Sequence, residues 1–341
     1  MSVLYRKYRP KAWKDVVGQE SIVSVLENEV KLGKLAHAYL FAGSRGTGKT
    51  SVARIFAAQV GTSTSDIYEI DAASQNGVDE IRALNEAVHT LPFESKYKVY
   101  ILDEAHMLSK GAWNAFLKTL EEPPAHVIFI LATTELDKVP ETVQSRCQTF
   151  VFKRPSQKVL REFATHIAKE EGRSLDAEAL ELISLLGDGS FRDTAGILDK
   201  VFSSTKEKAI HREELERVTG APRSGLVRDV LASIVEHDIK KGMQAVASAR
   251  ESNADMKIFS RLILENLRYL FLLRLRAGLD EHILAETSED DFNFIKGLAA
   301  KADKTLTAEI LLKFIDAAES SGRSTIPELP LEIALSESIK P

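Results

Sequence analysis

Cysteine is almost absent from this sequence, because Cys147 is the single cysteine among 341 residues. One thiol excludes an intramolecular disulfide framework and any zinc site built from four cysteines. So few cysteines also fit a reducing compartment, where thiols stay reduced. We expect Cys147 to be a small buried residue rather than a nucleophile, because the sequence suggests no base that would activate it.

An excess of basic residues is absent as well. Lys and Arg number 45 and Asp and Glu number 50, which gives a formal net charge of −5. Binding to nucleic acid would therefore need a local basic surface, since the bulk charge does not attract phosphates. The hydrophobic fraction of 44% and the charged fraction of 28% are ordinary for a globular protein, and they exclude a disordered or fibrous chain.

Long hydrophobic runs are missing too. The N-terminal residues lack the apolar stretch of a secretory signal peptide. The most apolar helical segment, roughly 258–279, is interrupted by charged residues such as Arg261, Glu265 and Arg268, so we expect no membrane span there. The sequence also contains no evident repeat, low-complexity tract or proline-rich linker. Together these absences predict a soluble, cytoplasmic protein.

The first half of the chain alternates short apolar runs with helical patterns. Strands separated by helices predict a parallel sheet covered on both faces, and strands this apolar belong in the middle of such a sheet. The strand candidates are residues 38–42, 67–70, 99–102, 127–131 and 149–152, and the helix candidates are residues 19–31, 49–60, 78–90, 109–121 and 140–145.

The second half carries no clear strand signal and reads as helical, with Gly187, Gly189 and Gly220 as breaks. A mass of 37.8 kDa suits two or three domains. We predict an α/β domain over residues 1–155, a small helical domain over 156–220 and an all-helical domain over 221–341.

A phosphate-binding motif follows the first strand candidate. Residues 43–50 read GSRGTGKT and match the pattern G-x-x-x-x-G-K-[ST] between a strand and a helix. Glycines let backbone N–H groups surround phosphate oxygens, and the helix N-terminus adds partial positive charge. In this pattern Lys49 reaches the β- and γ-phosphates, and the hydroxyl of Thr50 binds Mg²⁺. A chance glycine-rich turn is a poor alternative for the complete motif in this context.

Two acids end a later apolar strand, VYIL at 99–102. After a phosphate loop, Asp103 is expected to hold Mg²⁺ through water, and Glu104 to orient and deprotonate the attacking water. Acids at strand ends are common on surfaces, so the pairing with the loop carries this interpretation. The letters DEAH at 103–106 also suggest a helicase, but no other helicase pattern accompanies them.

Further motifs are YRP at 8–10, VVGQ at 16–19, HAYLF at 37–41, EIDAAS at 69–74, DEAHML at 103–108, LKTLEEPP at 117–124, LATT at 131–134, SRC at 145–147 and GSFRD at 189–193. With these motifs the chain resembles the clamp-loader clade of the AAA+ ATPases, and within it the gamma/tau subunits of bacterial DNA polymerase III. The resemblance is close over residues 5–193; residues 194–341 match only in helical character and length.

The resemblance implies an AAA+ P-loop core with a parallel sheet, a helical lid domain and an all-helical oligomerisation collar, with ATP and Mg²⁺ bound to the core. The implied nucleotide contacts are Tyr5, Arg9, Pro10, Val16 and Val17 around the adenine, Gly43, Ser44, Arg45, Gly46, Thr47, Gly48, Lys49, Thr50 and Ser51 around the phosphates, and Arg192 at the γ-phosphate.

Three further roles are implied by the resemblance. Thr134 is the polar sensor at a strand end, Arg192 is the sensor on the helical lid, and Arg146 is the arginine finger that reaches the ATP of a neighbouring subunit. A late guanidinium suits a transition state with charge spread over phosphoryl oxygens. Each has an ordinary alternative: Arg192 and Asp193 can form a surface ion pair, Arg146 can lie beside Cys147 without a role, and threonines are common in strands.

The sequence departs from the family in two places. Related chains carry a four-cysteine zinc module between the phosphate-loop helix and the EIDAAS strand, whereas only residues 59–66 stand here. We therefore expect no zinc. After EIDAAS comes Gln75-Asn76-Gly77, where some relatives have basic side chains. The remaining candidates for DNA contact are Arg82, Lys110 and Lys118, and solvated helix charges explain these residues equally well.

The C-terminal block carries no catalytic pattern. Its segment 258–273 forms a wide apolar helix surface, which a core helix mostly explains and whose excess fits a subunit-packing collar. The sequence thus predicts an ATP-driven motor subunit of a bacterial clamp loader. Its expected partners are other loader subunits, copies of itself, the sliding clamp, primer–template DNA and the replicative polymerase. The alternatives are another AAA+ DNA motor, for branch migration or at the fork, a non-hydrolysing structural subunit, and a monomeric nucleotide-binding switch.

Overall fold

The computed structural model describes residues 3–275, 278–302 and 306–339. Contacts divide the chain into two compact units. The first comprises Met1–Val159 together with the short segment Gly189–Asp193, and the second comprises Leu160–Asp188 and Thr194–Pro341. The division of the second unit into a lid and a collar at residue 220 stays a prediction.

The first unit is built on a five-stranded parallel sheet with the order β2-β3-β4-β1-β5. The strands are β1 (Ala38–Ala42), β2 (Ile67–Asp71), β3 (Lys98–Asp103), β4 (Val127–Thr133) and β5 (Gln148–Val151). Each coincides with a predicted strand within two residues. The register pairs Ala42 with Thr133 and Asp71 with Asp103, so the carboxyl ends of the strands lie along one edge.

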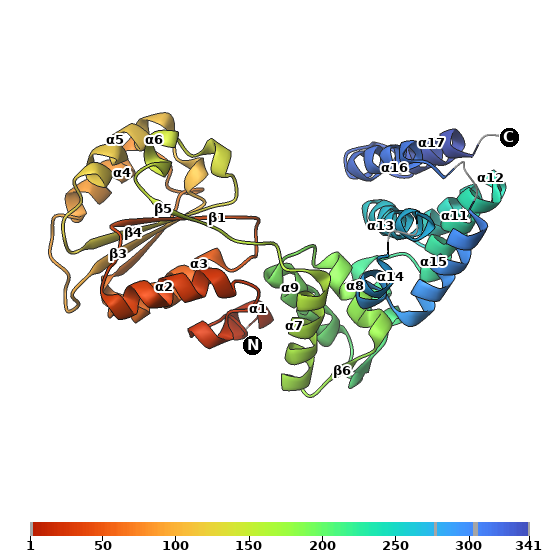
Figure 1. The fold of residues 1–341 in the computed structure, drawn as a ribbon, viewed down its shortest axis with the longest axis horizontal. Helices are drawn as coiled ribbons and strands as arrows, with labels where there is room; N and C mark the ends of the chain where they lie inside the picture. The colour runs from red at the N-terminus through yellow and green to blue at the C-terminus, as the bar shows by residue number, and fades with distance from the viewer. Residues whose placement is uncertain (1–2, 276–277, 303–305, 340–341) are drawn as a thin grey trace. The chain divides into compact units, whose positions relative to one another are not determined.

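Helices cover both faces of this sheet (Figure 1). One face packs against α2 (Glu20–Leu32) and α3 (Lys49–Gln59), with Phe41 and Phe56 fully buried between them. The other face packs against α4 (Val78–Ala87), α5 (Lys110–Glu121) and α6 (Glu141–Gln144), with Phe116 and Phe129 in that core. Short elements complete the unit: α1 (Leu4–Lys7), η1 (Trp13–Asp15), η2 (Thr64–Asp66), η3 (Ala105–Met107) and η4 (Leu136–Lys138).

Lys98 is an unusual core residue at the start of β3. Its side chain is buried, and its ammonium donates hydrogen bonds to the Ala87 carbonyl at 2.9 Å and the Thr90 hydroxyl at 2.7 Å. The Ala87 carbonyl is at the C-terminal end of α4, where backbone acceptors lack helical partners. Lys98 therefore fastens the end of this helix to the sheet.

The short connection between α3 and β2 is fixed by hydrogen bonds. The carboxylate of Asp66 is buried and accepts backbone N–H bonds from Phe93 at 2.6 Å, Glu94 at 3.1 Å and Ser95 at 2.9 Å. Burial alone would raise the pKa of Asp66, but these donors lower it to about 2. The ionised carboxylate thus joins the start of β2 to the loop before β3.

The second unit is mainly helical. Its elements are α7 (Gln157–Glu170), β6 (Ser174–Leu175), α8 (Ala177–Leu186), α9 (Phe191–Ser204), β7 (Ala209–Ile210), α10 (Arg212–Thr219), α11 (Ser224–Glu236), α12 (Ile239–Glu251), α13 (Met256–Arg274), α14 (Asp280–Glu286), α15 (Glu289–Lys301), α16 (Ala308–Ser321) and α17 (Leu329–Ser338). The expectation that no strand follows Pro155 is wrong in one detail, because β6 and β7 form a parallel pair. Two-residue strands leave no periodic signal in a sequence.

The apolar surface on α13 is core. Phe259, Ile263, Leu267 and Leu270 are fully buried, whereas Phe271 and Leu272 are only partly buried, so packing inside the unit explains most of this surface and the role of the rest in a collar stays a prediction. No helix in the described part of the chain is long and apolar enough to cross a membrane.

A buried polar cluster lies among the helices of this unit. Glu181 accepts the backbone N–H of Ser288 at 2.9 Å, and Asp291 pairs with Arg228 at 2.7 Å and faces Arg212 at 3.8 Å. Burial and the nearby Asp291 carboxylate raise the pKa of Glu181 to about 7. The cluster connects residues predicted to belong to the lid with residues predicted to belong to the collar.

Candidate nucleotide-binding site

The phosphate loop lies between β1 and α3, and its glycines have conformations that suit the motif. Gly43, Gly46 and Gly48 have φ angles of 148°, 76° and 102°, values that side-chain-bearing residues rarely adopt. A Cβ at Gly43 would come within 2.6 Å of the Phe152 carbonyl oxygen, and one at Gly46 within 2.0 Å of Ser190 Oγ. Both positions therefore require glycine for space as well as for backbone angle.

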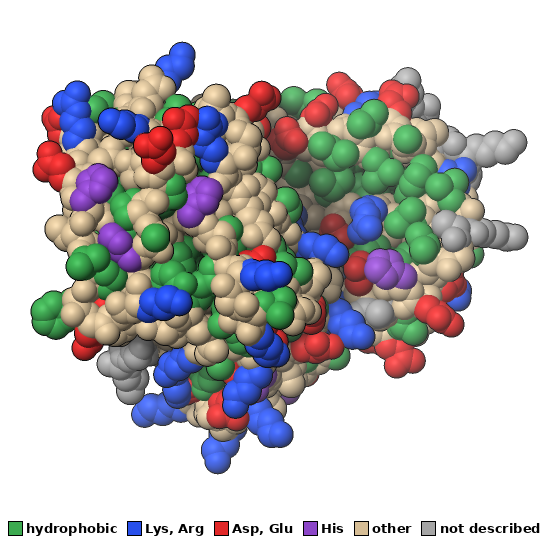
Figure 2. Space-filling view, turned by 60° about the vertical axis from the view of Figure 1, so that its left-hand side comes forward, with side chains coloured by type: hydrophobic (Ala, Val, Ile, Leu, Met, Phe, Trp, Pro, Cys, Tyr) green, Lys and Arg blue, Asp and Glu red, His purple; other side chains and the backbone are tan. Residues whose placement is uncertain are grey.

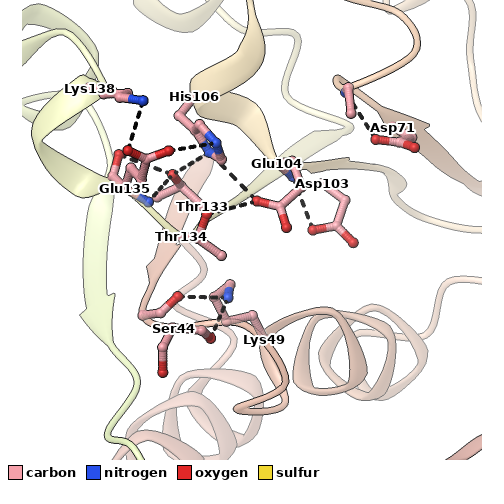
Figure 3. Close-up of polar contacts among 12 residues, drawn as sticks. Ser44, Lys49, Asp71, Asp103, Glu104, His106, Thr133, Thr134, Glu135 and Lys138 are labelled. Carbon is pink, nitrogen blue, oxygen red and sulfur yellow. Dashed lines mark hydrogen bonds and ion pairs between the residues drawn. The ribbon is translucent and has the colours of Figure 1, made fainter. Parts of the chain in front are cut away.

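Lys49 is the first residue of α3, and its side chain folds over the loop. Its ammonium donates to the carbonyl oxygens of Gly43 at 2.8 Å and Ser44 at 2.9 Å (Figure 3). Burial lowers the pKa of Lys49, while the carboxylates of Glu104 and Asp103 act in the opposite direction. The sequence-predicted lysine thus lies in the loop, and the acids at the end of β3, Asp103 and Glu104, are close enough to affect its pKa.

Thr50 and Asp103, the two predicted Mg²⁺ ligands, lie side by side. The Thr50 hydroxyl donates to Asp103 Oδ2 at 2.9 Å, across 53 residues of chain. A hydroxyl and a carboxylate are hard oxygen donors of the kind that Mg²⁺ prefers. With the glycine-lined loop and the Lys49 ammonium, these residues fit a nucleoside triphosphate bound with Mg²⁺.

Glu104 has the most unusual backbone at the site. Its φ of 49° and ψ of 43° lie in the left-handed region, which costs a non-glycine residue roughly 1–2 kcal/mol. Its carboxylate accepts a hydrogen bond from the Thr134 hydroxyl at 3.1 Å. The two residues, at the ends of the neighbouring strands β3 and β4, form a contact that the sequence did not predict. Strain at a polar strand end is often functional.

The adenine-side residues are only partly brought together. Arg9 Nε donates to Ser51 Oγ at 3.1 Å, and burial lowers the pKa of Arg9, helped by Arg54. Val16 packs against the core on the α2–α3 face, whereas Val17 is exposed. Pro10 is half-buried.

The segment Gly189–Asp193 belongs to the first unit. The backbone N–H of Phe191 donates to the Gly46 carbonyl at 3.1 Å, so this segment contacts the phosphate loop directly. The Arg192 guanidinium lies 5.1 Å from the ring centroid of Tyr5. Arg192 and Tyr5 are thus neighbours at the site, and the surface pair between Arg192 and Asp193 is not needed to explain Arg192.

Arg146 makes a contact that sequence reasoning missed. Its guanidinium pairs with Glu121 Oε1 at 2.5 Å and donates to the Thr142 carbonyl at 2.6 Å. Glu121 is the first glutamate of the LEEPP stretch and the last residue of α5. The only sequence signal for this ion pair is that the LEEPP and SRC motifs occur in the same chain. Neither motif indicates that Glu121 and Arg146 form a pair.

The DNA candidates lie on two packed helices. Arg82 is on α4 and pairs with Asp79 at 3.1 Å, while Lys110 and Lys118 are exposed on α5. The helices are joined by a hydrogen bond from the Asn85 side chain to the Ala115 carbonyl at 2.7 Å. Their role in DNA binding stays a prediction.

The phosphate loop also contains the predicted residues Ser44, Arg45 and Thr47. Ser44 and Arg45 are exposed in the loop, and the Thr47 hydroxyl donates to the Ser44 carbonyl at 2.9 Å.

Burial raises the pKa of the Cys147 thiol to about 12, which disfavours the nucleophilic thiolate. Among the described residues, no three His, Cys, Asp or Glu side chains are grouped as metal ligands.

The strand order, the loop between β1 and α3, and the acids ending β3 define a P-loop NTPase of the AAA+ fold. A solved structure of the Thermotoga maritima RuvB Holliday junction branch migration motor has the same fold, with a TM-score of 0.53 and 21% identity, and the match covers 76% of this chain and 91% of that one. At this identity the likeness shows the fold alone. A family model described as DNA polymerase III, delta subunit, matches residues 18–76 and 61–156.

The sequence relatives are more specific. DNA polymerase III subunit gamma of Buchnera aphidicola is 33% identical over 335 residues, which cover 91% of both chains. DNA polymerase III subunit tau of Bacillus subtilis is 37% identical over 309 residues, covering 84% of this chain and 54% of that protein. The chain belongs to the gamma/tau subunit family of bacterial DNA polymerase III. It spans about half the length of the Bacillus tau subunit and 41% of the gamma/tau subunit of Mycoplasma pneumoniae.

Proposed function

We propose that this chain is an ATP-hydrolysing motor subunit of a bacterial sliding-clamp loader, within the DNA polymerase III assembly and therefore in the cytoplasm. One observation carries the hydrolytic part: Lys49, Thr50, Asp103, Glu104 and Thr134 meet at the carboxyl edge of one sheet. Membership of the gamma/tau family supports the replication role. A structural subunit would not require this set of residues.

The residues divide the chemistry among themselves. Backbone N–H groups of the loop and the Lys49 ammonium bind the phosphates of ATP. Thr50 and Asp103 would hold Mg²⁺. The ion, when bound, neutralises charge on the phosphate oxygens. Glu104 orients the attacking water and accepts its proton, and Thr134 fixes the Glu104 carboxylate by its hydrogen bond.

We assign two arginines to the negative charge that develops on the phosphoryl oxygens in the transition state. Arg192, held beside Tyr5 and the phosphate loop, acts on the nucleotide of its own subunit. Arg146 acts on the nucleotide of the neighbouring subunit. ATP, the clamp and primer–template DNA favour the same closed arrangement of subunits, and hydrolysis removes the contribution of ATP. This differential affinity drives clamp opening, loading and release.

Binding to the proposed partners requires exposed residues on this chain that can contact them. Exposed apolar side chains remain on the last two helices, among them Leu312 and Ile315 on α16 and Ile333 on α17, and Figure 2 shows hydrophobic side chains gathered on the helical unit. Such residues suit packing against other loader subunits or copies of this chain in a collar. Arg82, Lys110 and Lys118 are the proposed DNA contacts. The clamp and polymerase are proposed from the family alone.

The test is ATP hydrolysis by the purified chain, assembled with candidate clamp-loader subunits. The reaction is measured alone, with clamp and primer–template DNA, and with a four-way junction. Stimulation by primer–template that rises with the clamp supports the proposal. Stimulation by the junction alone would favour a branch-migration motor, and ATP binding without hydrolysis would favour a structural subunit.

A further inference from the structure

His106 lies in the middle of a chain of polar contacts that ends on Glu104. Its side chain is 7% exposed and comes from η3, directly after the acids of β3. Ring atom Nδ1 lies 3.1 Å from Thr133 Oγ1 and 3.6 Å from Glu104 Oε2, and Nε2 lies 3.2 Å from Glu135 Oε1 (Figure 3). A buried imidazole thus stands between two carboxylates.

Hydrogen-bonding capacity sets the direction of these contacts. The Thr133 hydroxyl has one proton, which it donates to the backbone carbonyl of Glu135 at 3.2 Å. The same hydroxyl oxygen accepts a hydrogen bond from the backbone N–H of Glu135 at 3.0 Å. The carboxylate of Glu135 only accepts. Both ring nitrogens of His106 therefore face oxygen atoms that can accept a hydrogen bond.

The far end of the chain is also fixed. Lys138 pairs with Glu135 Oε2 at 2.8 Å, one turn further along η4. This ion pair and the burial of His106 leave the imidazole little freedom to rotate. Glu104 Oε2 accepts a hydrogen bond from the Thr134 hydroxyl at 3.1 Å, and His106 Nδ1 lies beside the same oxygen at 3.6 Å, in contact but beyond hydrogen-bond distance.

We propose that His106 is a positioning residue for Glu104, held in turn by Glu135. Resting on the ATPase function proposed above, the inference assigns the Glu135–His106 pair the task of fixing the orientation of the Glu104 carboxylate. The left-handed backbone of Glu104 leaves this carboxylate without a regular strand or helix to orient it, so side-chain partners must do so. His106 itself does not touch the nucleotide in this assignment.

The test compares variants in the assembled complex by ATP affinity and by single-turnover hydrolysis. His106→Phe keeps an aromatic ring at this position and removes both ring nitrogens, and we expect ATP affinity unchanged and the hydrolysis rate lowered about 10- to 100-fold. His106→Asn keeps the donor facing Thr133 and Glu104 and should recover part of the rate, whereas His106→Gln keeps the donor facing Glu135 and should recover less. His126→Phe is the matched control, because His126 immediately precedes β4 at the opposite end from Thr133.

A double-mutant comparison separates positioning from a general loss of structure. In the Glu104→Gln background, His106→Phe should cause no further loss of rate, because its target is gone. An equal loss in both backgrounds, or a full rate in His106→Phe, overturns the inference. If His106→Phe does not fold, Glu135→Gln gives the same test from a partly exposed position. We expect it to lower the hydrolysis rate at unchanged ATP affinity, and an unchanged rate would contradict the inference. Should Glu104→Gln itself hydrolyse ATP normally, the proposed function fails instead.

Discussion

The guanidinium of Arg146 is held by the carboxylate of Glu121, 2.5 Å away and 25 residues earlier in the chain. Their side chains are 33% and 50% exposed, so water screens the pair and its contribution to folding is at most about 1 kcal/mol. The pair joins two sequence motifs, LEEPP and SRC, that have no evident connection when read separately. Its consequence is therefore expected in function rather than in stability.

Arg146→Ala in the assembled complex should leave ATP affinity unchanged and abolish the stimulation of hydrolysis by primer–template DNA. An arginine that acts late on the transition state is worth about 10³-fold or more in rate. The measurements are nucleotide binding by fluorescence and steady-state hydrolysis with and without DNA. Equal loss of binding and turnover would exclude action on a neighbouring subunit.

Glu121→Gln is the companion variant. It keeps the shape of the side chain but removes the charge that holds Arg146, and we expect reduced DNA stimulation with an unchanged thermal midpoint. A drop in the midpoint with normal stimulation would show that the pair serves only the fold.

Gly46→Ala should weaken ATP binding by more than about tenfold, because the added Cβ would come within 2.0 Å of Ser190 Oγ at the phosphate loop. Gly61→Ala is the control, since Gly61 also has a positive φ, 84°, but nothing lies within 4 Å of its added Cβ. Both changes carry the backbone cost of roughly 1–2 kcal/mol. Isothermal titration with a non-hydrolysable ATP analogue separates them, and equal affinities for the two variants would refute the steric argument.

Glu181→Gln should stabilise the helical unit at pH 8. The pKa of Glu181 is raised from 4.5 to about 7, so the folded state binds its proton more tightly than the unfolded state. Its contribution is fully present below pH 4.5 and is lost as the pH rises through 7, which costs about 3 kcal/mol at alkaline pH. Urea unfolding between pH 4.5 and 8 checks this: the wild type should weaken with rising pH more steeply than the variant, and parallel curves would contradict it.

Asp66→Asn should destabilise the first unit at neutral pH, because an amide cannot accept the three backbone N–H bonds as strongly as a carboxylate. The pKa of Asp66 is lowered from 3.8 to about 2. The stabilisation is therefore present above pH 3.8 and is lost as the pH falls through 2. Acid unfolding monitored by circular dichroism should show a steeper loss for the wild type than for the variant; the same acid dependence in both would exclude Asp66.

The sequence was sufficient for the sheet and the phosphate loop, because these depend on local patterns. Apolar runs that end in Gly43 or Asp103 locate strands, and their common carboxyl edge brings Thr50 to Asp103 without any further information. The same logic predicted Glu104 at this edge, whereas Thr134 was expected only from the family resemblance, and the hydrogen bond between the two was not predicted.

What escaped prediction depends on side chains that meet through tertiary packing. The bond between His106 and Glu135 requires two turns after neighbouring strands to face each other, and no periodicity encodes that. Glu181 lies in a helix of otherwise ordinary pattern, yet its partner Ser288 is 107 residues away. A charged residue at an apolar helix position was the available signal, but the buried partner could not be named.

Lys98 gives this protein an internal chemical reporter. Amine-reactive reagents label exposed lysines quickly, but Lys98 is only 4% exposed, and its ammonium lies 4.9 Å from the Tyr68 ring centroid and donates to two oxygens. Its acylation must wait for the start of β3 to separate from Ala87 at the end of α4 and from the nearby Thr90. Mass-spectrometric footprinting of this one amine therefore measures how often the contact between the start of β3 and the end of α4 opens. Comparing the labelling rate with and without nucleotide shows whether ATP stabilises this contact, which is remote from the phosphate loop.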